Sequence, residues 1–139
     1  MSAAQTRWTF RVPGLAATKG STRSFVARGR VVTKADCNRL KPWSRDVAWA
    51  ARAAGTRLAP KGQAVRVSVT FVLPRPRATS AAALYSVVRP DVDKLTRACL
   101  DALTGVAYAD DGQVASQTAH KVLGLRGEEP RTEVMVEWL

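Results

Sequence analysis

The segment from Ala64 to Leu73 has the most regular pattern in the chain. Apolar side chains occupy every second position, at Val65, Val67, Val69, Phe71 and Leu73. The side chains between them carry little charge. A period of two over this length is typical of a β-strand with one face buried. The chain is therefore expected to contain a sheet, in which this segment is the clearest strand.

Other segments have the same period. Thr6–Val12 alternates apolar and polar side chains, and Gln113–Leu123 and Thr132–Leu139 do so near the end of the chain. A turn is expected between the last two, and a short strand at Arg30–Thr33. These segments supply the remaining strands of the expected sheet.

Two segments have helical spacing instead. Pro42, at a first-turn position, opens a helix that is expected to run to about Ala54 and to stop at Gly55. A second helix is expected from about residue 92 to residue 104, closed by Gly105. In 139 residues this pattern predicts an α/β (α+β) fold. The expectation is a compact single domain spanning residues 1–139, with a mixed sheet of about four to five strands packed by two helices.

Two long segments lack either period. Residues 15–30 are rich in Lys, Arg, Gly, Ser and Thr and are expected to form a mobile basic loop. Residues 74–90 contain three prolines and three arginines and are expected to form a long, partly flexible connection. Tryptophans 8, 43, 49 and 138 fall on apolar faces or at element ends, which predicts core or dimer-interface positions.

Charge is distributed unevenly along the chain. Of the 22 Lys and Arg residues, 17 precede Pro90, whereas only two of the 11 acidic residues do, so residues 1–89 carry a formal charge of +15. The rest carries −4 and includes five aspartates between positions 91 and 111. A basic body with a local acidic cluster is what an enzyme needs to bind a polyanion and hold a divalent metal against it.

Several classes of protein are disfavoured by composition. No apolar run of 18 residues and no secretory leader is visible, so a cytoplasmic protein with no membrane partner is expected. Cys37 and Cys99 have no zinc-ligand spacing and are expected to be reduced and buried. His120, within a strand, is expected to be structural. No motif for an organic cofactor is present.

The aspartates form two pairs around the second expected helix. Asp91 and Asp93 lie at its start, and Asp110 and Asp111 follow its end. A strand returning alongside the helix would bring the pairs together, and carboxylates with waters and phosphate oxygens are what Mg²⁺ requires. The alternative is structural: Asp91 caps the helix, and Asp110 and Asp111 belong to an ordinary turn. Asp101 is expected to form a surface ion pair instead.

The run from Arg89 to Val114 resembles the signature of the RusA family of Holliday junction resolvases. The shared pattern is R-P-D-x-D before a helix, then D-A-L-T-G, an aromatic residue and D-D-x-Q-V entering a strand. Members of that family are small α/β homodimers that use Mg²⁺ to cut four-way DNA junctions by symmetrical nicks in opposing strands. The resemblance implies the same activity here, in recombination and repair and in a phage or prophage setting, with Mn²⁺ as a substitute metal.

Carried over by position, the resemblance identifies Asp91, Asp93 and Asp111 as metal-binding catalytic acids, with Asp110 as their neighbour. One departure concerns the mechanism, because family members often have Asn and Lys where this chain has Lys94 and Arg97. Arginine can stabilise charge on a phosphate but does not act as a proton donor. If a lysine is chemically necessary, Lys94 has to serve.

Basic residues in the two irregular segments, and one in a later strand, are the candidates for contacts with DNA phosphates. They are Lys19, Arg23, Arg28, Arg30, Arg75, Arg77, Arg89 and Lys121. Two alternative functions stay open at this point. One is a non-catalytic basic nucleic-acid-binding protein in which the aspartates only cap and turn. The other is a nuclease of the same fold that prefers flaps or forks.

Overall fold

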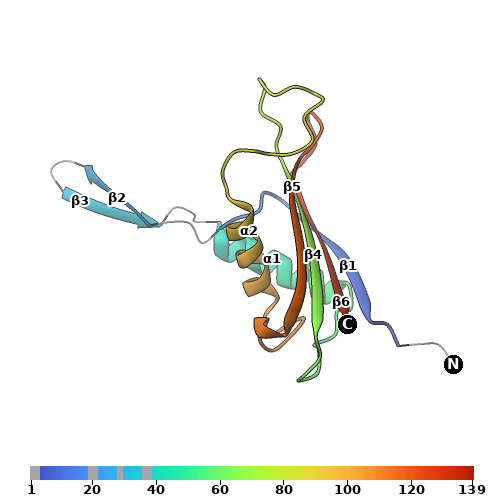
Figure 1. Cartoon of the computed structure of the whole chain (residues 1–139). Helices are drawn as coiled ribbons and strands as arrows, with labels where there is room; N and C mark the ends of the chain where they lie inside the picture. Colours follow the sequence, from blue (N-terminus) through green and yellow to red (C-terminus); the bar gives the residue numbers. More distant parts are fainter. Residues whose placement is uncertain (1–3, 19–21, 28–29, 36–38) are drawn as a thin grey trace.

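The computed structural model describes residues 4–18, 22–27, 30–35 and 39–139. Within them the chain forms six strands and two α-helices, coloured by position in Figure 1. In chain order the elements are β1 (Arg7–Pro13), β2 (Thr22–Ala27), β3 (Arg30–Ala35), α1 (Leu40–Ala53), β4 (Val65–Leu73), α2 (Val92–Leu103), β5 (Val114–Leu123) and β6 (Arg131–Trp138). Lys19, Arg28 and Cys37 lie outside the described residues.

Four strands form one mixed sheet in the order β1-β6-β4-β5. The β4 and β5 strands are parallel, and the β1–β6 and β6–β4 pairs are antiparallel. Parallel neighbours need a crossover, which the 74–91 connection and α2 supply. The predicted strand at 64–73 is therefore confirmed as β4, an inner strand of the sheet.

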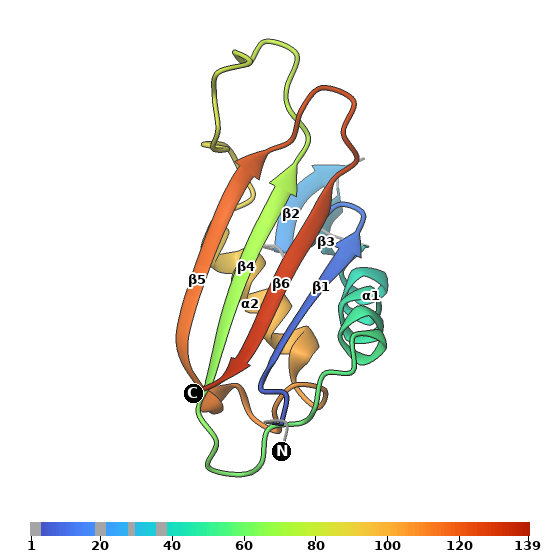
Figure 2. The same cartoon turned by 90° about the vertical axis from the view of Figure 1, so that its right-hand side faces the viewer.

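Both helices cover the same face of the sheet. Figure 2 looks onto the other face, with the sheet in front. The core lies between these layers, where α2 buries Leu95, Cys99 and Leu103 completely. Burial of Cys99 raises its thiol pKa to about 12, which agrees with its expected role as an inert apolar side chain. No helix within the described residues is long and apolar enough to span a membrane.

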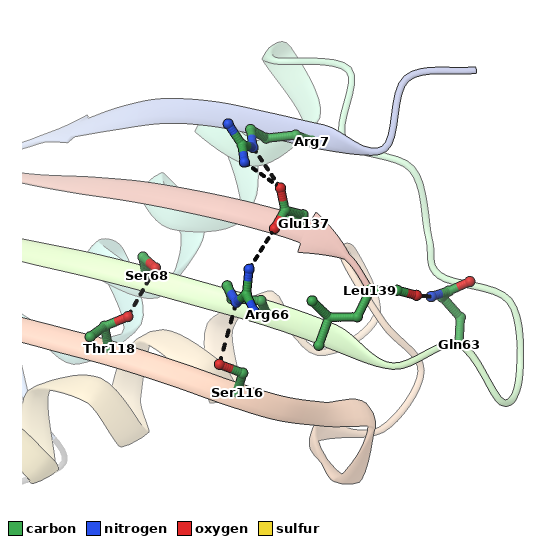
Figure 3. A network of polar contacts seen from close by, with 8 residues as sticks. All are labelled: Arg7, Gln63, Arg66, Ser68, Ser116, Thr118, Glu137 and Leu139. Atoms are coloured by element: carbon green, nitrogen blue, oxygen red, sulfur yellow. Dashed lines mark hydrogen bonds and ion pairs between the residues drawn. The ribbon is translucent and has the colours of Figure 1, made fainter. Parts of the chain in front are cut away.

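No described helix lies on the opposite face of the sheet, which carries a network of polar side chains (Figure 3). Glu137 on β6 accepts hydrogen bonds from Arg7 Nε at 2.7 Å and from Arg66 Nη1 at 2.9 Å, which links β1, β6 and β4. The Ser68 and Thr118 hydroxyls, 3.1 Å apart, extend the links to β5. The bond from Arg7 is the main reason why the pKa of Glu137 is lowered. The face is thus held by charge pairs and hydroxyls in place of a covering layer.

Helix α1 begins two residues before Pro42 and ends as predicted. Its buried face consists of Trp43, Val47 and Ala51. Gly55 has a φ of 79°, and its amide donates to the Arg52 carbonyl, a cap that favours glycine. Trp49 was expected in the core or a dimer interface, and the core alternative is wrong because its side chain is 72% exposed. The residues one turn before and after Trp49 are exposed, so the prediction that placed Trp49 in the core from its apolar character failed.

The expectation of a basic loop at residues 15–30 is corrected in part, because this segment contains a strand. Residues 22–27 form β2, which pairs antiparallel with β3, and the short strand expected at Arg30–Thr33 is confirmed within β3. The hairpin extends away from the four-stranded sheet (Figure 1). In β2 three polar residues are followed by three apolar ones, so the two kinds do not alternate and the period of two is not visible in this segment.

Replacing Tyr108 by Phe is expected to lower the free energy of unfolding by about 1 kcal/mol. The Tyr108 side chain is fully buried, and its hydroxyl donates a 2.7 Å hydrogen bond to the Leu100 carbonyl. That carbonyl also accepts from the Thr104 hydroxyl, so the substitution does not leave it without a partner. Urea unfolding followed by circular dichroism measures the loss. A loss as large as that of the matched Tyr108→Ala variant would contradict this account.

Candidate active site

The N-terminus of α2 presents two acidic side chains. Asp91 is the N-cap residue, with an extended backbone, and its carbonyl accepts the first helical bond from the Leu95 amide at 3.1 Å. Its carboxylate, however, makes no capping hydrogen bond. Asp93 follows in the first turn and is exposed. The structural alternative, in which Asp91 caps the helix, therefore does not describe this carboxylate.

The connection before Asp91 is attached to the C-terminal half of β5. The Ser86 amide donates to the Lys121 carbonyl at 3.0 Å, and the Leu123 amide donates to the Leu84 carbonyl at 2.9 Å. The Lys121 ammonium then donates to the Val88 and Pro90 carbonyls at 2.6 and 2.8 Å. Strand β5 thus holds the segment that delivers Asp91 to the helix.

Asp110 and Asp111 differ from each other in their surroundings. The Asp110 carboxylate accepts the Gly112 amide at 2.8 Å and caps a 3₁₀ turn at Asp111–Gln113, with the Gln113 side chain completing a capping box. For Asp110 the turn alternative therefore describes the geometry. Asp111 points elsewhere: its carboxylate accepts a 3.0 Å bond from Arg97.

Arg97 lies between the two acidic pairs. It is four residues, about one helical turn, after Asp93, and its guanidinium contacts Asp111. A second contact, at 3.9 Å, joins its Nε to Asp101, which confirms the surface ion pair expected for that residue. The side chains of Arg97 and Asp101 are both largely exposed, so these ion pairs contribute little to the free energy of unfolding. The contact with Asp111 was not anticipated.

Two depressions along α2 and β5 join these groups into one shallow groove. One, of about 350 Å³, is lined by Asp111 and Arg97, and the other, of about 340 Å³, by Asp93 and Arg97. Arg97, Leu100 and Gln117 line both. The groove therefore has an acidic side chain towards each end and a guanidinium between them.

The structure does not gather the four carboxylates into one cluster. Within the described parts of the chain, no three His, Cys, Asp or Glu side chains lie close enough to hold a metal ion together. Asp91 and Asp93 nevertheless suit a hard divalent cation, because both offer oxygen donors that no described hydrogen bond or ion pair occupies. One or two carboxylates with waters and substrate phosphate oxygens are a common set of ligands for Mg²⁺.

The predicted basic residues have varied surroundings. Arg89 and Arg77 are exposed, while Arg75 donates to the Gly124 and Ser80 carbonyls at 2.9 and 2.6 Å. Lys94 is exposed in the first turn of α2. Arg23 and Arg30 are placed by their backbones, in β2 and β3. Among these cations, Arg89 and Lys94 flank the acidic pair in sequence, two residues before Asp91 and directly after Asp93.

Gln117 was missed at the level of sequence. It lines both depressions and alternates along β5 with Ala119 and Lys121. The period of two places these three residues on one face of the strand. A polar residue in a strand is too common to mark a site, so only the packing of α2 against β5 identifies it.

Comparison with known families agrees with this geometry. The model of the family described as Endodeoxyribonuclease RusA matches residues 16–137 of the 139-residue chain. The matched range contains both helices, the whole groove and all strands except β1 and the last residue of β6. A comparison with curated proteins returned no match. The resemblance noted in the Arg89–Val114 run is thereby confirmed, and the chain belongs to the RusA family of endodeoxyribonucleases, divalent-metal-dependent enzymes that resolve Holliday junctions.

Proposed function

We propose that this protein is a Mg²⁺-dependent, structure-selective endonuclease that resolves four-way junctions by paired nicks in opposing strands during recombination and repair. The observation that carries the proposal is that the Asp91 carboxylate, at the N-terminus of α2, makes no capping hydrogen bond. An N-cap aspartate normally satisfies the free amides of its own helix. Here the side chain does not do so, and it lies two residues before Asp93, which lines the groove together with Arg97.

Asp91 and Asp93 would hold the metal ion, Mg²⁺ with Mn²⁺ as a substitute. A bound divalent cation would supply activation of water and stabilisation of charge on the scissile phosphate. Asp111 is the proposed third acid, and it becomes available when a substrate phosphate takes over its bond from Arg97. Asp110 holds the turn that presents Asp111.

Arg97 would act on the phosphate directly. In hydrolysis the water oxygen bonds to phosphorus, one phosphorus–oxygen ester bond breaks, and the departing oxygen gains a proton. Negative charge grows on the phosphoryl oxygens during this step, and a guanidinium donates to them in a fixed, planar geometry. Arg97 therefore stabilises charge, and Lys94 is the proposed proton donor near the same helix end.

DNA is proposed to bind through the basic residues around the groove. Arg89 flanks the acidic pair, and Arg75 and Arg77 belong to the connection before it. Lys19, Arg23, Arg28 and Arg30 belong to the segment that includes the hairpin. Phosphate contacts of this kind supply affinity that falls with salt and carries no sequence reading, as recognition of junction shape requires.

A homodimer is part of the proposal, because paired nicks across a two-fold symmetric junction need two active sites. Light scattering at the working concentration would measure the mass. A dimer mass supports paired incision by a preformed enzyme. A monomer that stays monomeric on the junction would contradict it.

A panel of DNA substrates tests the function. We expect the protein to nick a four-way junction at symmetrical positions in Mg²⁺ and to cut flaps, forks and plain duplex more slowly. In Ca²⁺ or EDTA the protein should bind the junction without cutting it. Faster cutting of flaps or forks would assign a different substrate, and the absence of Mg²⁺-dependent nicking on any substrate would favour a DNA-binding protein without catalysis.

A further inference from the structure

Lys121 uses its ammonium group within the chain. Its Nζ donates to the Val88 carbonyl at 2.6 Å and to the Pro90 carbonyl at 2.8 Å. A lysine has three N–H donors, and hydrogen bonds from a charged donor are about twice as strong as neutral ones. Two of the three are therefore committed to the backbone of the active-site connection.

These bonds hold a segment that makes no other hydrogen bond to the described residues. Within the described chain, the two bonds from Lys121 are the only hydrogen bonds made by residues 87 to 90. Packing holds little of the segment, because Val87 is 91% exposed, Val88 is 59% exposed and Arg89 is exposed as well, and only Pro90 is half-buried. Between the Ser86 backbone bond and the start of α2, these four residues are therefore held by one side chain from β5.

The two acceptor carbonyls lie at functionally important positions in the chain. They belong to the residues on either side of Arg89, and Pro90 directly precedes Asp91. Because the Asp91 carboxylate makes no capping bond, the helix does not orient that side chain. The direction of Asp91 is then set by the backbone that arrives from Pro90.

We propose that Lys121 is a positioning residue, which holds the backbone on either side of Arg89 from the edge strand and so aims Asp91 at the metal. The inference rests on the proposed function of the site. It gives Lys121 a role in orienting the site and not the phosphate contact that its charge first indicated. A residue that supports a metal ligand in this way typically contributes about 10- to 100-fold to metal affinity or activity.

The test uses Lys121→Met, which keeps the aliphatic stem and removes the ammonium, and Lys121→Arg, which restores donors. Lys61→Met is the matched control, because Lys61 is exposed in a distant turn and its replacement removes the same charge. We expect Lys121→Met to cut the junction about 10- to 100-fold more slowly in single turnover. Its affinity for the junction in Ca²⁺, and the salt dependence of that affinity, should match those of the Lys61→Met control. Lys121→Arg should recover part of the rate.

Thermolysin supplies a readout that does not depend on activity. It cleaves before exposed apolar residues, so a released segment at Val87 and Val88 should be cut faster in Lys121→Met, with an unchanged melting temperature. Equal cleavage by thermolysin together with a wild-type nicking rate would overturn the proposal. So would a salt slope reduced by about one in Lys121→Met relative to the control, because that marks a lost phosphate contact.

The two hypotheses fail in different ways. A wild-type protein that cuts no substrate would overturn the proposed function, while the thermolysin comparison would still decide whether Lys121 holds the segment. If Lys121→Met does not fold, the comparison passes to Lys121→Arg. If Lys121→Arg then resisted thermolysin as the wild type does but did not nick the junction, a positioning role would be contradicted.

Discussion

Asp93→Asn should abolish junction cleavage in Mg²⁺ while leaving junction binding intact. The substitution keeps the shape of the side chain but removes the negative charge that a divalent cation requires. Metal ions supply several kcal/mol of charge stabilisation, so we expect a loss of about 1,000-fold in the single-turnover rate. Gel-based nicking assays measure the rate, and fluorescence anisotropy in Ca²⁺ measures binding.

The matched control for this prediction is Asp46→Asn. Asp46 is exposed on α1, away from the groove, and loses the same charge. Its cleavage rate should equal that of the wild type. Full cutting by Asp93→Asn would remove Asp93 from the metal site, and loss of binding in that variant would indicate a structural effect.

Arg97→Gln should slow cleavage by about 100-fold or more, because a donor aimed at developing charge contributes this much in comparable sites. Arg97→Lys keeps the charge and should retain more activity than the Gln variant. The loss should appear in kcat more than in KM, since charge on the phosphoryl oxygens grows only as the bond breaks. Folding should be unaffected, because the Arg97 side chain is 67% exposed.

Arg45→Gln is the control for a lost arginine, since Arg45 is exposed on α1. Faster cleavage by Arg97→Gln would contradict the role assigned to Arg97. It would mean that the 3.0 Å contact with Asp111 withholds that carboxylate from the metal. If Arg97→Lys were more active than the wild type, the result would indicate that an ammonium at this position donates a proton in the reaction.

Elements with a strong period were predictable from the sequence. The strand at 64–73 and the helix at 92–104 were located closely, because burial repeats at every second residue in the first and at helical spacing in the second. The parallel pairing of β4 with β5 was not predictable, because period alone does not select a neighbour. Strand β2 was missed for another reason, because its residues show no period of two.

The candidate site could be proposed from the sequence as a set of residues but not as a geometry. The motif placed Asp91, Asp93, Asp110 and Asp111 around one helix and assigned Asp110 as the neighbour of Asp111, but it gave no geometry for either side chain. Their difference arises from a single turn, in which Asp110 accepts the Gly112 amide and Asp111 accepts Arg97. The internal use of Lys121 was hidden for a similar reason, since its partners are backbone carbonyls that no side-chain pattern records.

The attachment of the active-site connection to β5 has a consequence for solubility. β5 is the last strand of its sheet, and an edge strand offers unpaired amides and carbonyls to any other extended chain. Near residues 121–123 that edge is occupied by the connection, through the Ser86 and Leu84 bonds and the Tyr85–Val122 bridge. The segment that precedes Asp91 thereby also blocks intermolecular strand pairing at this edge. Variants that release the segment from β5 are therefore expected to aggregate sooner as well as to cut more slowly.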